Sequence, residues 1–210
     1  SAYETGPLAN PVNDAADTQR FVRDYRRTAA DLVAANYYGR LEELTVKGGL
    51  RGTHSESGGP FFTQWIDALQ CLGTTAIPMG EFWSGRHQTV KQAANAAHIY
   101  GKPLCQAEAF TSMSICDWTA DPWGMKNIGD SAFCDGLTRN VLCFWIHQSR
   151  LDAKPGFQWA HVGTHFDCNL IWWPMADGWL TYLARCQHML RQGRFVADYA
   201  FLREETVPDF

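Results

Sequence analysis

The sequence predicts an α/β fold with a parallel sheet, because short apolar strands alternate with helical segments. Strands are expected at residues 48–57, 75–82, 104–111 and 140–148. Segments with helical periodicity separate them, which is typical of βαβ units and a parallel sheet. Four strands are about half of an eight-stranded barrel. The fold is therefore either an incomplete (β/α) barrel or a smaller open α/β sheet.

An ionisable residue lies near the end of each predicted strand. Glu56, Glu81 and Glu108 follow the apolar parts of the first three strands, and His147 follows the fourth. A carboxylate in such a position is costly to bury unless it is paired or functional. The C-terminal ends of the strands form the active-site rim of a (β/α) barrel. We therefore expect these four residues at the same end of the sheet.

The remaining chain is assigned to helices and loops within one domain, residues 1–210. Residues 1–16 are expected to be an irregular lead-in, and residues 149–175 a long loop rich in aromatic residues. Helices are expected at residues 18–35, 40–47, 61–73, 88–100, 128–137 and 177–191. Residues 36–39 are expected to break the first two helices apart, and residues 195–203 to form a last strand.

Composition excludes several classes of partner. The net charge of −4 and the absence of a basic block argue against binding to a nucleic-acid backbone. No apolar run is long enough to span a membrane. The seven cysteines form no CxxC pair, and several lie in apolar patterns, so we expect mostly reduced, buried thiols.

Each candidate residue has a structural alternative. Glu108 could be a buried carboxylate paired with Lys or Arg, and Glu56 a loop carboxylate. Glu81 is followed by Phe82 and Trp83, and apolar walls of this kind raise a carboxyl pKa as a general acid requires. The structural alternative for Glu81 is an ion pair that anchors a loop. The histidines show no HExxH spacing, so the signal for zinc is weak.

Several unbroken motifs closely resemble glycoside hydrolase family 106, the α-L-rhamnosidases. They are GGLRGTHSESGGP, IPMGEFW, VKQAANAAHIYGKPLCQAEAFTS, GTHFDCNLIWW and YLARCQHMLRQGRFVADYAFL. The resemblance covers roughly residues 18–210, and family members are much longer. It implies the C-terminal part of a catalytic (β/α)8 TIM-type barrel, with the remainder of the catalytic domain upstream as its partner. It also implies a bacterial, secreted or periplasmic enzyme that hydrolyses α-L-rhamnosidic bonds in glycans or glycosides, by inversion and with calcium.

The resemblance also implies roles for individual residues. Glu108, in the AEAFT motif, corresponds to the general acid, and Glu81, in MGEFW, to a site carboxylate and calcium ligand. Glu56 is a third catalytic candidate, although the general base can come from a segment upstream. Further residues are expected to contact the substrate: His54, Trp83, His147, His165, Trp172 and Trp173. Trp145 and Trp159 are also candidates for stacking on sugar, and core packing is the alternative for the loop tryptophans.

Two other classes of function remain open. One is a carbohydrate-binding fragment without catalysis, because half of a barrel would be absent from this chain. The other is a metal-dependent hydrolase built on His147, His161 and His165.

Overall fold

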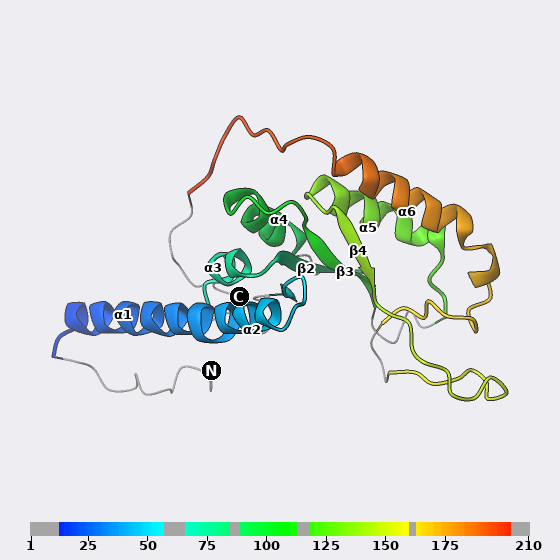
Figure 1. Cartoon of the computed structure of the whole chain (residues 1–210), viewed down its shortest axis with the longest axis horizontal. Coiled ribbons are helices and arrows are strands. Elements are labelled where there is room, and N and C mark those ends of the chain that lie inside the picture. The colour runs from blue at the N-terminus through cyan, green and yellow to red at the C-terminus, as the bar shows by residue number, and fades with distance from the viewer. Residues whose placement is uncertain (1–12, 57–65, 85–88, 113–117, 160–162, 203–210) are drawn as a thin grey trace.

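The computed structural model describes residues 13–56, 66–84, 89–112, 118–159 and 163–202. A parallel sheet of four strands in the order β1-β2-β3-β4 lies at its centre (Figure 1). The strands are β1 (His54–Glu56), β2 (Ile77–Trp83), β3 (Gln106–Thr111) and β4 (Arg139–Leu142). The α/β fold with a parallel sheet is thus confirmed, while a closed barrel does not form among the described residues.

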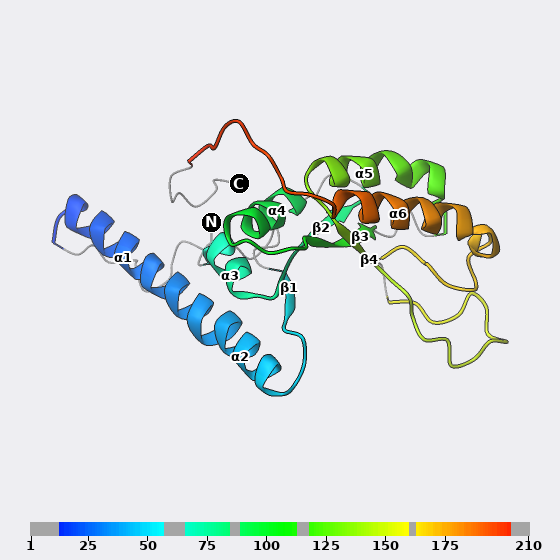
Figure 2. The same cartoon turned by 45° about the horizontal axis from the view of Figure 1, so that its top comes forward.

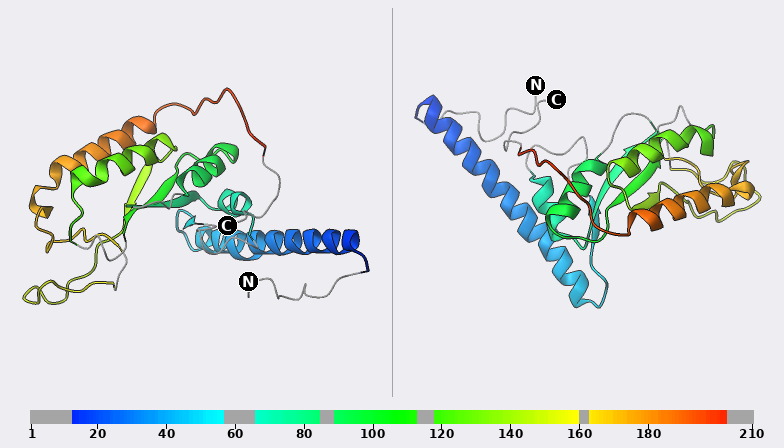
Figure 3. Two further views of the ribbon diagram at one scale, coloured as in Figure 1. Left: turned by 180° about the vertical axis from the view of Figure 1, so that it is seen from behind. Right: turned by 90° about the horizontal axis from the view of Figure 1, so that it is seen from above.

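Helices follow the strands in alternation and cover one face of the sheet. They are α3 (Ala68–Thr74), α4 (Val90–Ile99), α5 (Pro122–Cys134) and α6 (Asp177–Leu190). Two starts are fixed by aspartate caps: Asp67 accepts a hydrogen bond from the N–H of Gln70, and Asp121 accepts from those of Trp123 and Gly124. Figure 3 shows α5 and α6 side by side along the same side of the sheet as α4.

The main core lies between the sheet and these helices. The inward-facing strand residues Phe82, Ala107 and Ala109 are fully buried. They belong to one apolar cluster with residues of the helices, which include Val90, Met125, Ala132, Trp179 and Leu183. Because side chains alternate across a strand, the residues between them face the opposite, helix-free side of the sheet.

A bulge interrupts this alternation near the end of β3. The register between β2 and β3 shifts after Phe82, so that Trp83 aligns with Thr111. Phe110 has a φ of +62° and points, like Ala109, into the core, where its ring lies 4.8 Å from that of Phe82. Thr111 therefore returns to the helix-free face, as expected for an extra residue inserted in one strand.

The N-terminal helix is not broken where the sequence predicts it. α1 (Ala15–Val33) continues through a π-helical segment, Ala34–Gly39, into α2 (Arg40–Lys47). Packing explains the difference, since Tyr38 is buried and its hydroxyl donates a hydrogen bond to the carbonyl oxygen of Glu56 at 3.0 Å. Figure 2 shows the resulting long helix projecting from the rest of the molecule.

Other predicted boundaries are also corrected. α5 begins at Pro122 rather than near residue 128, because Asp121 caps it. β4 ends at Leu142 rather than at residue 148, and the chain then pairs with a later segment: Phe144 N–H donates to the carbonyl of Thr164 at 3.0 Å. Residues 195–202 form no strand, and several of their apolar side chains are exposed.

Two expectations, about membrane spans and about thiols, can be compared with the described residues. None of the helices there is both long and apolar enough to cross a membrane. The six cysteines among them are free: three are buried (Cys71, Cys105, Cys143), two are exposed (Cys134, Cys168) and Cys186 is half-buried. The expectation of buried thiols therefore applies to only part of the set.

Candidate active site

Three glutamates lie together on the helix-free face of the sheet. Glu81 of β2 is directly opposite Glu108 of β3. Glu56 of β1 aligns with Met79, which is two positions before Glu81 and therefore on the same face. We call these three residues the carboxylate cluster.

Glu81 is the most firmly held member of the carboxylate cluster. Its side chain is nearly buried, and Oε2 accepts a hydrogen bond of 2.7 Å from the indole N–H of Trp83. Its backbone is tied to Thr89 in both directions: the N–H donates to Thr89 Oγ1 at 2.8 Å, and the carbonyl accepts from the N–H of Thr89 at 2.9 Å. Trp83, predicted as a sugar contact, thus orients a carboxylate.

Gly80 makes this attachment possible. A Cβ at position 80 would lie 2.6 Å from the carbonyl oxygen of Thr89. The start of α4 therefore approaches β2 more closely than any larger residue would permit.

Glu108 is held by two residues that sequence reasoning missed. The hydroxyl of Thr111 donates to Oε1 of Glu108. The thiol of Cys143, the first residue after β4, lies within hydrogen-bonding reach of Thr111 and Glu108. Burial, together with the charges of Glu108 and Glu56, raises the pKa of Cys143 to about 12, so the thiol is neutral at physiological pH.

Glu56 has a strongly perturbed acidity. Burial raises its pKa to about 8, and the charges of Glu81 and Glu108 add to the effect, while a backbone hydrogen bond from Glu108 opposes it. Its Oε1 has no hydrogen-bond partner among the described residues. Glu56 therefore retains its proton near neutral pH, chiefly because the buried site disfavours the charged form.

Structural ion pairs are the alternative expected for Glu81 and Glu108. The ion pairs seen between described residues lie at the surface and include none of the three glutamates: Arg20–Asp17, Arg23–Asp24, Arg40–Glu43, Lys126–Asp130 and Arg150–Asp152.

His54 lies one step away from the carboxylate cluster, at the start of β1. It approaches Gln106, a buried residue of β3 two positions before Glu108. One orientation of the Gln106 amide gives hydrogen-bond partners to both its nitrogen and its oxygen. In this orientation Gln106 donates to Nδ1 of His54 at 3.3 Å and accepts from Nε of Arg139 at 3.2 Å. The three side chains form a polar layer beneath the carboxylates.

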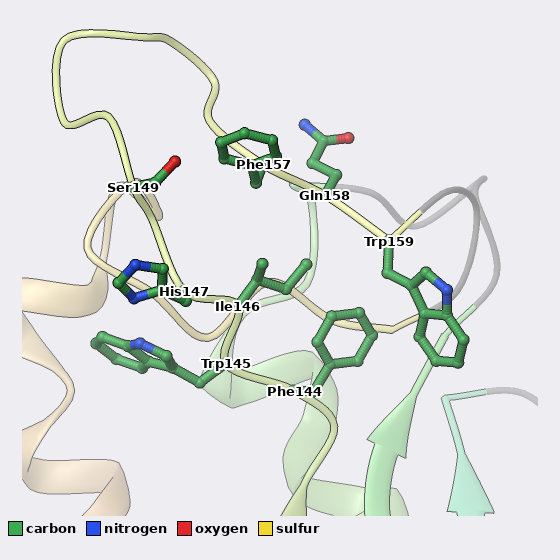
Figure 4. Close-up of a pocket in the computed structure, with 8 residues that line it drawn as sticks. All are labelled: Phe144, Trp145, Ile146, His147, Ser149, Phe157, Gln158 and Trp159. Atoms are coloured by element: carbon green, nitrogen blue, oxygen red, sulfur yellow. The ribbon is translucent and has the colours of Figure 1, made fainter.

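His147 is not at a strand end, contrary to the prediction. It lies five residues beyond β4, in a loop that borders a cavity of about 620 Å³ (Figure 4). The cavity is lined by residues 144–147, 149 and 157–159, among them Phe144, Trp145, Phe157 and Trp159. We call it the aromatic pocket.

The other predicted substrate contacts lie in the loop that leads to α6. His165 is buried and stacks on Trp118, with ring centroids 4.1 Å apart. The indole of Trp172 donates to the carbonyl of Ala120 at 2.8 Å, and its ring packs against the main core. The ring of Trp173 meets that of Trp145 at 5.4 Å. This geometry gives Trp172 a packing role and connects Trp173 to the aromatic pocket.

The described residues do not present a ready metal centre. They contain no group of three or more His, Cys, Asp or Glu side chains arranged to hold a metal ion. His161, part of the alternative histidine site, lies outside them, and His147 is exposed while His165 is buried under Trp118. The carboxylates are the oxygen donors that calcium prefers, but their arrangement here does not define a ligand set.

The fold and the site define an α/β unit that presents three carboxyl groups on one face of a parallel sheet, and pairs of carboxyl groups are what most glycoside hydrolases use. Comparison with known proteins gives the family: residues 8–209 match the alpha-L-rhamnosidases, and the chain belongs to glycoside hydrolase family 106.

Individual relatives are much longer than this chain. It is 37% identical over 195 residues to a Formosa agariphila protein named "Putative beta-glucuronidase", a match that covers 91% of this chain and 16% of that protein. The solved structure of a rhamnosidase from Novosphingobium sp. PP1Y superimposes with a TM-score of 0.79 at 31% identity and covers 84% of this chain and 17% of that one. The 210 residues thus span about one-sixth of the length of these relatives.

Proposed function

We propose that this chain supplies catalytic carboxylates for the hydrolysis of terminal α-L-rhamnosidic bonds, as part of a (β/α)8 barrel completed by upstream sequence. The observation that carries the proposal is the carboxylate cluster, in which Glu81 faces Glu108 and Glu56 has a raised pKa. A protonated and an ionised carboxyl group are the two reagents that glycoside hydrolysis needs.

The proposed mechanism is inverting. One carboxylic acid protonates the departing glycosidic oxygen, while a carboxylate on the opposite face of the sugar removes a proton from the attacking water. We assign the role of proton donor to Glu108, because it lies in the AEAFT motif that resembles the family's general-acid segment. The pKa of about 8 at Glu56 supports the opposite assignment, with Glu56 as donor, as the second candidate. Glu81, fixed by Trp83, would orient the sugar hydroxyls.

Two substrates with different leaving groups distinguish these assignments in the complete enzyme. Loss of the acid slows cleavage of methyl α-L-rhamnoside but spares a dinitrophenyl rhamnoside, whose leaving group needs no proton. We expect this pattern for Glu108→Gln and loss of both reactions for a base variant. If Glu56→Gln gives the acid pattern while Glu108→Gln loses both reactions, the roles are exchanged. Full activity of both variants on both substrates would refute the proposed site.

Calcium remains part of the proposal through the family resemblance, with Glu81 as the candidate ligand. The grouping of three carboxyl groups supports it, because a cation would offset the charge repulsion from Glu81 and Glu108, which adds to the effect of burial on the pKa of Glu56. We route no catalytic step through the ion, since the described residues define no ligand set. Added calcium should raise the melting temperature of the chelator-treated enzyme, and less so in Glu81→Gln.

A binding role without catalysis is the second candidate function, and the exposed rings that line the aromatic pocket favour it. Incubating the complete protein with an aryl rhamnoside separates the two: protection against unfolding without product release would mean binding alone. Secretion or export to the periplasm is proposed on the resemblance alone, and fractionation of the source cells would test it.

A further inference from the structure

The aromatic pocket is built in advance of any ligand. The side chain of Gln148 spans the base of the loop: Nε2 donates to the carbonyl of Phe157 at 3.1 Å, and Oε1 accepts from its N–H at 2.9 Å. The same amide donates to the buried carboxylate of Asp167 at 3.3 Å. Figure 4 shows the two segments that this clamp joins, with Phe157 facing the segment that carries His147.

The rings of the aromatic pocket are anchored but not covered. Trp145 is 57% exposed, although its ring meets that of Trp173 edge to face. The ring of Trp159 is held in a similar way against Phe144, at 5.5 Å between centroids. Flat rings that are anchored by a T-shaped contact and remain more than half exposed are suited to stacking with an incoming ligand.

Polar groups lie among these rings. His147, Ser149 and Gln158 line the same cavity, and each can form hydrogen bonds with hydroxyl groups. A volume of about 620 Å³ is that of a small-molecule site. A sugar ring combines an apolar C–H face with a hydroxyl-bearing edge, which matches this mixture of lining groups.

The aromatic pocket adjoins the carboxylate cluster along the chain, through the step from Cys143 to Phe144. Phe144 follows Cys143 directly, and the thiol of Cys143 lies against Glu108. In the sheet order, β4 adjoins β3 with Glu108, whereas Glu56 is on β1 at the other edge. The pocket thus lies on the side of the proposed proton donor, which must face the departing oxygen.

We propose that the aromatic pocket binds the sugar ring on the leaving-group side of the bond that is cleaved, stacked on Trp145. This inference rests on the proposed function and adds to it which residues receive the sugar on the leaving-group side.

The test compares two substrates in the complete enzyme. One is methyl α-L-rhamnoside, which has no second ring. The other is whichever rhamnosyl-glucose disaccharide, linked through O2, O4 or O6 of glucose, the wild type cleaves fastest. The ratio of the two kcat/KM values should fall about tenfold in Trp145→Ala, as truncation of an aromatic anchor predicts. Trp145→Phe should retain most of the ratio, because it keeps a ring.

Phe195→Ala is the matched control. Phe195 is 58% exposed and stacks on His98 of α4, away from the pocket, so both kcat/KM values should stay at the wild-type level. An unchanged ratio in Trp145→Ala would overturn the inference, as would a wild-type enzyme that cleaves no disaccharide faster than methyl rhamnoside. Absence of all rhamnosidase activity in the wild type would instead refute the proposed function.

Discussion

The hydroxyl of Thr111 donates a hydrogen bond to the carboxylate of Glu108, three positions earlier on the same strand. In a regular strand, residues three apart face opposite sides of the sheet. The bulge at Phe110, with its φ of +62°, brings the two side chains to one face. A local irregularity of the backbone thus positions the proposed proton donor.

Thr111→Val should therefore lower kcat for rhamnoside hydrolysis by about 10- to 100-fold. Glu108 becomes charged as it gives up its proton, and a hydrogen bond to a charged group contributes about 1.5–3 kcal/mol. Thr111→Ser keeps the hydroxyl and should retain most of the activity. Steady-state kinetics with methyl α-L-rhamnoside measure both. Equal loss in the two variants would mean that shape at this position, and not the hydrogen bond, is what matters.

The raised pKa of Glu56 predicts how stability changes with pH. The folded protein binds a proton that the unfolded chain releases near pH 4.5, and it holds this proton up to about pH 8. The stabilising contribution is therefore complete below pH 4.5 and is lost as the pH rises through 8, by at most about 1.4 kcal/mol per pH unit. Glu56→Gln should flatten this part of a plot of melting temperature against pH. An identical slope in wild type and variant would show that Glu56 is not the group that retains the proton.

Gly80→Ala should destabilise the enzyme by about 1–3 kcal/mol, because the added methyl group would meet the backbone of Thr89. The displaced strand also carries Glu81, so activity should fall as well. Gly178→Ala is the control: a Cβ at this position in α6 has no atom within 4 Å, and alanine should stabilise the helix by about 0.5–1 kcal/mol. Thermal unfolding distinguishes them, and a stabilising Gly80→Ala would contradict the close approach.

Gln148→Ala should loosen the wall of the aromatic pocket. Without the amide, the N–H of Phe157 loses its acceptor, and hydrogen exchange at that position should accelerate about tenfold. Gln192→Ala removes a similar amide bond at the end of α6 and should leave Phe157 unchanged. Exchange at Phe157 that does not differ between the two variants would mean that the loop is held by other contacts.

Expressed alone, the 210 residues should associate and hydrolyse rhamnosides poorly. Among the described residues β1 and β4 each pair on one side only, and α1 exposes Phe21 and Leu32. Unpaired strand edges and open apolar surface promote aggregation. Light scattering after gel filtration, together with turnover relative to the complete enzyme, tests this. A monodisperse, fully active monomer would contradict it.

The sheet and its acidic face could be predicted because their signals are local. Alternating apolar and polar residues fix which side chains share a face, so Glu81 and Glu108 were identifiable on their strands. Thr111 was not, since the same alternation would place it on the opposite face. Only the bulge at Phe110 changes this, and no pattern in the letters marks that irregularity.

The region after β4 shows what local sequence patterns could not predict. The run around Phe144 and Ile146 is as apolar as a strand, which led to the prediction of His147 at a strand end. The backbone instead leaves the sheet, because Cys143 and Phe144 pair with Thr164. A partner about 20 residues later in the chain cannot be read from periodicity.

Pairing of each strand with the next one along the chain also bears on how the molecule folds. Contacts between neighbours in sequence form early, because closing a short loop loses little entropy. The three acidic side chains therefore come together as β1, β2 and β3 dock, while water still reaches the helix-free face of the sheet. Repulsion among them is screened at that moment and grows only when later packing excludes the solvent. Refolding should consequently slow most with rising pH in its final, enclosing step rather than in the docking of the strands.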